Sequence, residues 1–160
     1  MLTFTRTLKD GTAVEFKFAC THNNTYYEYI NDKGIEFHFS IRDKNIAPFN
    51  IDVRRYEGLG YGTALISIMF EIIETYHKDV KFIYGKLSTS DFTDHGNLWQ
   101  TSIPFYLKQK DNAYLIKCDR NLHMIYNTED TNDYFNTKYY SYKDFIQGGA
   151  SIGYIIYPLL

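Results

Sequence analysis

The composition of this chain of 160 residues favours a folded protein and excludes two classes of partner. Its length and its 44% hydrophobic content favour a single domain over residues 1–160 with a core of its own. The 17 basic and 19 acidic residues give a net charge of −2, so there is no positive field for a nucleic acid. No run approaches the roughly 18 apolar residues of a membrane span.

The cysteines and the N-terminus bear on the compartment. Cys20 and Cys118 have no metal-like spacing and are too few for a disulfide scaffold, which favours a reducing compartment. Residues 1–10 lack the apolar stretch of a signal peptide. We therefore predict a cytoplasmic protein with no metal and no membrane contact.

The first fifty residues alternate between apolar and polar side chains, as strands do, and the 16 Tyr and 12 Phe residues suit strands. Asp10-Gly11 and Asp32-Lys33-Gly34 are turn signals between the runs. The predicted strands are Leu2–Phe4, Ala13–Ala19, Tyr26–Ile30, Ile35–Ile41 and Ile46–Val53. This order predicts an antiparallel meander.

The period of the pattern changes at Thr63. Leu65, Ile68, Met69, Ile72 and Tyr76 recur at spacings of three and four, which predicts an amphipathic helix of about four turns. Its apolar stripe must pack on a sheet.

The remaining residues predict a strand at 80–87, a helix at 98–108 and strands at 113–118 and 122–126. A helix at 134–145 and an apolar strand at 151–157 would follow. The fold class is therefore α+β, with a mixed, mostly antiparallel central sheet and flanking helices. The apolar run 154–160 predicts a core strand or, less favoured, a contact between two copies in a homodimer.

Three glycines, Gly58, Gly60 and Gly62, lie between the fifth predicted strand and the long helix. At this position the free amides of the first helical turn would point outward at the positive end of the helix dipole, and glycines let an anion approach them. The alternative is that the glycines only build a tight connection between strand and helix.

The turn resembles the pyrophosphate loop of the GNAT family of acetyltransferases. That family has a strand ending in Val-x-x-Tyr, then an Arg/Gln-x-x-Gly-x-Gly loop, then a helix that opens with small residues and Leu. The chain has Glu57 at the Arg/Gln position. The matching residues are Val53, Tyr56, Gly60, Gly62, Thr63, Ala64 and Leu65. The resemblance implies a three-layer α/β arrangement with a splayed pair of central strands, and acetyl-CoA as cosubstrate. The cofactor-binding residues that it implies are Ile51, Val53, Arg55, Leu59, Gly60, Tyr61, Gly62, Thr63 and Ala64.

A second stretch, Ile103–Lys108, resembles the start of the family helix that carries a Tyr followed by Lys-x-Gly-Phe. By that resemblance Tyr106 is the general acid that gives a proton to the departing CoA thiolate. A phenol with a pKa near 10 suits this task. The other reading of Tyr106 is half-buried packing on a short helix.

Acetyl transfer also requires a base that accepts a proton from the amine of the acceptor. Glu36, Asp52 and His38 on the predicted central strands are the candidates. The expected function is therefore transfer of an acetyl group from acetyl-CoA to a primary amine. The rival hypotheses are a binding module for acyl-CoA or a nucleotide without catalysis, and a Tyr-rich interaction domain whose Gly turn binds nothing.

Overall fold

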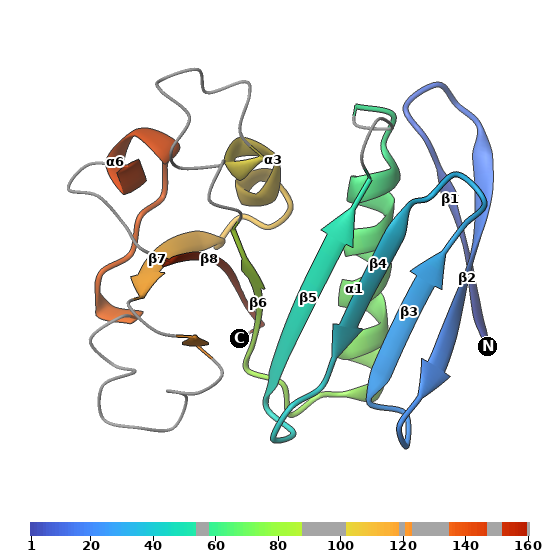
Figure 1. Ribbon diagram of the computed structural model, residues 1–160, viewed down its shortest axis with the longest axis horizontal. Helices are drawn as coiled ribbons and strands as arrows, with labels where there is room; N and C mark the ends of the chain where they lie inside the picture. The colour runs from blue at the N-terminus through green and yellow to red at the C-terminus, as the bar shows by residue number, and fades with distance from the viewer. Residues whose placement is uncertain (54–57, 88–101, 119–120, 123–134, 147–151, 160) are drawn as a thin grey trace. The chain divides into compact units, whose positions relative to one another are not determined.

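The computed structural model describes residues 1–53, 58–87, 102–118, 121–122, 135–146 and 152–159. The chain divides into two units, Met1–Ile83 and Tyr84–Leu160, which are described in turn (Figure 1). Strands and helices follow one another along the chain as expected for the α+β class. The single domain over residues 1–160 stays a prediction.

Unit 1 is the predicted antiparallel meander followed by a long helix. Its strands are β1 (Leu2–Thr7), β2 (Ala13–Thr21), β3 (Tyr26–Ile30), β4 (Glu36–Ser40) and β5 (Ile46–Asp52), and its helix is α1 (Tyr61–Tyr76). Each strand pairs antiparallel with the next one along the chain. The five strand predictions are confirmed, and α1 begins at Tyr61, two residues before the predicted start.

Most apolar positions of these strands alternate with polar ones, so the large apolar side chains share one face of the sheet. Figure 1 shows α1 lying along one face of the strands of this unit. Phe16 contacts Tyr61 of α1, with ring centroids 6.2 Å apart. The buried aromatic residues of this face are Phe16, Phe18, Tyr27, Tyr29, Phe37, Phe39 and Phe49, and the buried positions of α1 are Tyr61, Ala64, Leu65, Ile66, Ile68, Met69, Ile72 and Ile73. Burying a large apolar side chain contributes about 1.5–3 kcal/mol, so this interface dominates the stability of unit 1.

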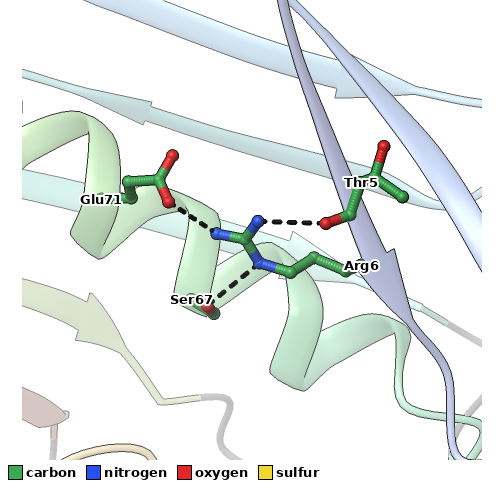
Figure 2. A network of polar contacts seen from close by, with 4 residues as sticks. All are labelled: Thr5, Arg6, Ser67 and Glu71. Atoms are coloured by element: carbon green, nitrogen blue, oxygen red, sulfur yellow. Dashed lines mark hydrogen bonds and ion pairs between the residues drawn. The ribbon is translucent and has the colours of Figure 1, made fainter.

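Polar contacts of Arg6 join β1 to α1 beside that interface (Figure 2). Its guanidinium donates to Glu71 Oε1 at 3.1 Å and to Ser67 Oγ at 3.4 Å, both on α1, and to the backbone oxygen of Thr5 at 3.1 Å. Glu71 is half exposed, so the ion pair contributes at most about 1 kcal/mol. Its main effect is to fix how the edge strand lies beside the helix.

The strand β6 (Phe82–Lys86) leads from unit 1 into unit 2. Unit 2 contains α3 (Ile103–Lys108), β7 (Tyr114–Cys118), α6 (Tyr142–Ile146) and β8 (Ile152–Pro158). Strand β8 lies between β6 and β7 and pairs antiparallel with β7. Residues 153–157 of β8 are buried, so the apolar run near the C-terminus forms a core strand, as favoured from the sequence.

Three predictions in this unit need correction. The helix predicted over 98–108 begins at Ile103, after Ser102, with Pro104 in its first turn, where proline suits a helix; residues 98–101 lie outside the described part. Leu122 is helical where a strand was predicted over 122–126, of which the remainder is not described. The helix predicted over 134–145 is interrupted, because the backbone of Tyr139 exchanges two hydrogen bonds with Leu115.

The described helices are all too short or too polar to serve as membrane spans.

A histidine at the C-terminal end of α1 joins the helix to the sheet of unit 1. His77 is the C-cap residue of α1, and its Nε2 lies 2.7 Å from the hydroxyl of Tyr27 on β3. Burial lowers the pKa of His77 and raises that of Tyr27, so the folded state favours a neutral imidazole beside a protonated phenol.

This contact predicts a loss of stability at acidic pH. Because the pKa of His77 is lower in the fold than in the unfolded chain, the unfolded chain takes up the proton first as the pH falls below about 6.5. Urea unfolding measured from about pH 8 down to about pH 5 should show the free energy of unfolding falling in the wild type and falling less in His77→Asn. His22→Asn, which removes an exposed histidine, is the control and should keep the wild-type slope. An unchanged slope in His77→Asn would contradict this role.

Candidate functional site

The predicted cofactor site lies at one end of the strands of unit 1. In an antiparallel meander every second turn lies at the same end of the sheet. The turn 8–12, the turn 31–35 and the end of β5 therefore meet at the end where α1 begins, as Figure 1 shows. Four separate stretches of sequence contribute to this end of the unit.

The backbone of the Gly turn has conformations that favour glycine. Gly58 has φ +81°, and Gly60, the N-cap residue of α1, has φ +101°. The backbone N–H of Lys9 donates to the carbonyl of Leu59 at 3.2 Å, which ties the turn 8–12 to the start of the helix. A Cβ on Gly60 would lie only 3.2 Å from Lys9 N. Gly60 is thus required by local geometry, whether or not a ligand binds.

The first turn of α1 contains three backbone amides that have no acceptor within the helix. The first helical bond runs from Ala64 N to the carbonyl of Gly60, so the amides of Tyr61, Gly62 and Thr63 have no acceptor within the helix. This turn contains no acidic residue, and no side chain of the described residues caps it. Leu59 is 46% exposed and Thr63 is exposed, so solvent reaches this end of the helix. The helix dipole adds a partial positive charge there.

Two lysines contact residues at the start of α1. Lys33, in the turn 31–35, places its Nζ 3.1 Å from the hydroxyl of Tyr61 and 5.6 Å from the centre of its ring. The Cγ of Lys9, in the turn 8–12, would lie 3.4 Å from a Cβ on Gly60. Both lysines are exposed. The helix dipole favours an anion at the first turn of α1, and Lys9 and Lys33 add positive charge in turns that also carry Asp10 and Asp32.

These two lysines were not among the site residues predicted from the sequence. Each lysine belongs to a short polar turn, and in the sequence alone it looks like an ordinary solvated surface charge. The number of strands could have located them. In a five-stranded meander the turns alternate between the two ends of the sheet, so the first turn (8–12) and the third turn (31–35) lie at the same end as the residue that follows β5.

The other predicted cofactor residues have different environments. Tyr61 and Ala64 are buried with their side chains in the core, so only their backbone can contribute to binding. Ile51 and Val53, at the end of β5, are half-buried. Arg55 lies outside the described residues.

The candidate bases Glu36 and Asp52 are directly opposite one another on β4 and β5. Their neighbours Phe37 and Ile51 form the next pair, and Phe37 is fully buried, so the two carboxylates project from the face that does not carry α1. Both lie at the strand ends nearest the start of α1, since Glu36 begins β4 and Asp52 ends β5. His38, the third candidate, projects from the same face and stacks on Tyr26 with ring centroids 5.9 Å apart.

Tyr106 lies in unit 2, where its side chain is half-buried on α3. Its backbone carbonyl accepts a hydrogen bond of 2.8 Å from the hydroxyl of Tyr157 on β8. Burial, and then the proximity of Tyr106, raise the pKa of Tyr157, so its phenol remains a donor. This contact fixes the end of α3 without using the phenol of Tyr106.

A cavity of about 480 Å³ lies elsewhere in unit 1. It is lined from β3, β4, β5 and the turns 21–26 and 41–45, at the opposite end of the strands from the Gly turn. His38 is the one sequence-predicted site residue among those lining it. In the part of the chain that the structure describes, no group of three His, Cys, Asp or Glu residues is placed to hold a metal ion.

Comparison with models of known protein families gives no match. Comparison with curated proteins likewise finds no relative. The resemblance to the GNAT family therefore depends on the motif residues themselves.

The two glycines of positive φ make a matched test of the turn. Gly60→Ala should destabilise the fold by about 1–2 kcal/mol for the strained backbone, plus the crowding against Lys9. Gly58→Ala has the same kind of strain, but its Cβ would meet no atom of the described residues within 4 Å, so it should cost less. Urea unfolding of the two variants would measure the difference. Equal losses, or a larger loss in Gly58→Ala, would show that Lys9 does not constrain the turn.

Proposed function

We propose that this chain is an N-acetyltransferase of the GNAT type, which transfers an acetyl group from acetyl-CoA to a primary amine. The observation that carries the proposal is the start of α1, where three amides without helical partners follow a glycine turn and two lysines contact residues at the start of the helix. A diphosphate needs this combination of backbone donors, positive dipole and nearby cations.

The finer features of the fold belong to the same proposal. A GNAT-type arrangement implies three layers and a splayed pair of central strands that admits the pantetheine arm. The order along the chain supports it: a meander, the Gly turn, a long helix, a strand, a short helix with Tyr106, and further strands.

The residues at the ends of β4 and β5 suit the proton transfers of this reaction. The acetyl group arrives as a thioester. The C–N bond forms and the C–S bond breaks, so one proton must leave the amine and one must reach the sulfur. Glu36 or Asp52 would accept the first proton, because both are carboxylates at the same end of the sheet as the Gly turn. Tyr106 would donate the second.

The proposal is tested by the release of CoA thiol from acetyl-CoA with a panel of primary amines, such as a polyamine, an amino sugar and a lysine peptide. Turnover with at least one amine is expected. Binding of acetyl-CoA without turnover would favour the noncatalytic module. If calorimetry detects no binding at about millimolar acetyl-CoA, the acetyltransferase and the noncatalytic binding module are both rejected, and the Tyr-rich interaction domain is favoured.

Gly62→Ala separates ligand binding from folding. Gly62 lies inside α1 without a positive φ, so its backbone conformation suits alanine, and urea unfolding of the variant checks that the fold is retained. Its Cβ, however, points toward the helix N-terminus and crowds the approach to the amides. We expect roughly tenfold weaker binding of acetyl-CoA, equivalent to about 1.4 kcal/mol, by calorimetry. Thr75→Ala, near the other end of α1, is the control and should bind as the wild type does.

Tyr106→Phe tests the proton donor. Phenylalanine keeps the backbone carbonyl that accepts from Tyr157 and the ring that contacts Phe105, so α3 should be preserved. We expect kcat to fall by about 10²-fold or more while the Kd for acetyl-CoA is unchanged. Tyr140→Phe, which alters a tyrosine that is 63% exposed in the same unit, should leave kcat unchanged. An equal effect of both variants would remove Tyr106 from the mechanism.

A further inference from the structure

The cavity of unit 1 has the side chains of a binding site for a small anion with a planar ring. It extends from the end of the strands opposite the Gly turn as far as His38 and Asn50, which lie two residues from Glu36 and Asp52 on the same face of the sheet. None of the residues proposed to bind acetyl-CoA is among the described residues that line it. At about 480 Å³ its volume is in the usual range for sites that bind small molecules.

The lining supplies positive charge and hydrogen-bond donors. Arg42 lines the cavity from the turn 41–45, and Thr25, Ser40 and Asn50 provide hydroxyl and amide groups. Among the described residues that line the cavity, none is acidic. Guanidinium and hydroxyl donors of this kind are typical partners of carboxylates and phosphates.

Two imidazoles add further donors. His22 and His38 both line the cavity, from the turn 21–26 and from β4. Nδ1 of His22 lies 2.9 Å from the hydroxyl of Thr21. When that hydroxyl donates to Nδ1, the neutral ring carries its proton on Nε2 and can donate it to an oxyanion.

The same residues form an aromatic surface on which a ring can pack. Tyr26 and His38 are stacked with an interplanar angle of 23°, and His22 meets Tyr26 edge-on with ring centroids 5.6 Å apart. The hydroxyl of Tyr26 donates to Glu28 Oε2 at 3.1 Å, so the carboxylate beside the cavity on β3 is already engaged. Burial, and then this bond to Glu28, raise the pKa of Tyr26 and keep its phenol protonated.

The backbone beside the cavity is held in a costly conformation. His22, Asn23 and Asn24 have φ values of +56°, +56° and +62° in succession. Each such residue costs about 1–2 kcal/mol, with asparagine the least. Two hydrogen bonds offset part of this cost. Thr25 Oγ1 donates to the backbone carbonyl of His22, and the hydroxyl of Tyr27 donates to the backbone carbonyl of Asn24. Strain of this kind that surrounding contacts maintain is frequent where a backbone positions a ligand-binding side chain.

We propose that this cavity binds a small organic molecule that carries a carboxylate or phosphate on a planar ring, with the anionic group at Arg42 and the ring on Tyr26 and His38. The proposal does not depend on the acetyltransferase activity.

The test is calorimetry of the full chain with phenyl phosphate, benzoate, inorganic phosphate and benzyl alcohol. We expect phenyl phosphate or benzoate to bind with a Kd in the millimolar range or tighter, and more tightly than either inorganic phosphate or benzyl alcohol. The better of the two ring anions identifies the anionic group. If neither binds at about 10 mM, or if neutral benzyl alcohol binds as well as they do, the proposal is wrong.

A matched pair of variants then places the anion. Arg42→Gln should weaken the binding of the better ring anion by roughly fivefold or more. Lys44→Gln removes the same charge from the same turn at a residue that does not line the cavity, and should bind as the wild type does. Equal affinity in Arg42→Gln and Lys44→Gln would overturn the assignment. Unfolding curves of both variants establish that the fold is retained, and Arg42→Lys, which keeps the charge, should recover part of the affinity.

Discussion

Burial of one aromatic face of the meander against the apolar stripe of α1 is the constraint on which unit 1 depends. Side chains on β2, β3 and β4 point to the same face because strands alternate, and α1 supplies a matching row at helical spacing. The helix must therefore lie along the sheet, and the short connection from β5 fixes the end at which it begins. The position of the amides in the first turn of α1 follows from this packing.

Gly60 and Gly62 differ in whether the backbone of the fold requires a glycine. Gly60 needs its positive φ and its missing Cβ so that the turn 8–12 can approach and Lys9 can bond to Leu59. Gly62 lies in regular helix, where an alanine would be the better helix former, and so has no such backbone requirement. Because the fold does not require a glycine at position 62, Gly62 is more informative about ligand binding than Gly60. This distinction could not be made from the spacing of the glycines.

Much of unit 1 could be predicted from the sequence, because period-two alternation and a change to helical spacing are local signals. Tyr26–Ile30 was predicted to the residue, and the Gly turn was correctly placed between strand and helix. The opposition of Glu36 and Asp52 was not predicted, since it depends on the register of two strands. The contact between Lys33 and Tyr61 joins residues 28 positions apart and needs the tertiary fold. In unit 2 the strand-like pairing of Tyr139 with Leu115 overrode a helical pattern, which no local signal could reveal.

Unit 1 thus has two chemically distinct ends, with a helix N-terminus and lysines at one and a cavity lined by arginine and imidazoles at the other. The central claim is that the first end binds the diphosphate of CoA through backbone amides. Amide chemical shifts of ¹⁵N-labelled protein during titration with CoA test this most directly. The account predicts that the amides of Tyr61, Gly62 and Thr63 shift most. The claim is contradicted if the signals of these three amides do not move. This holds whether the signals that do move belong to residues around Arg42 or no signal moves at all.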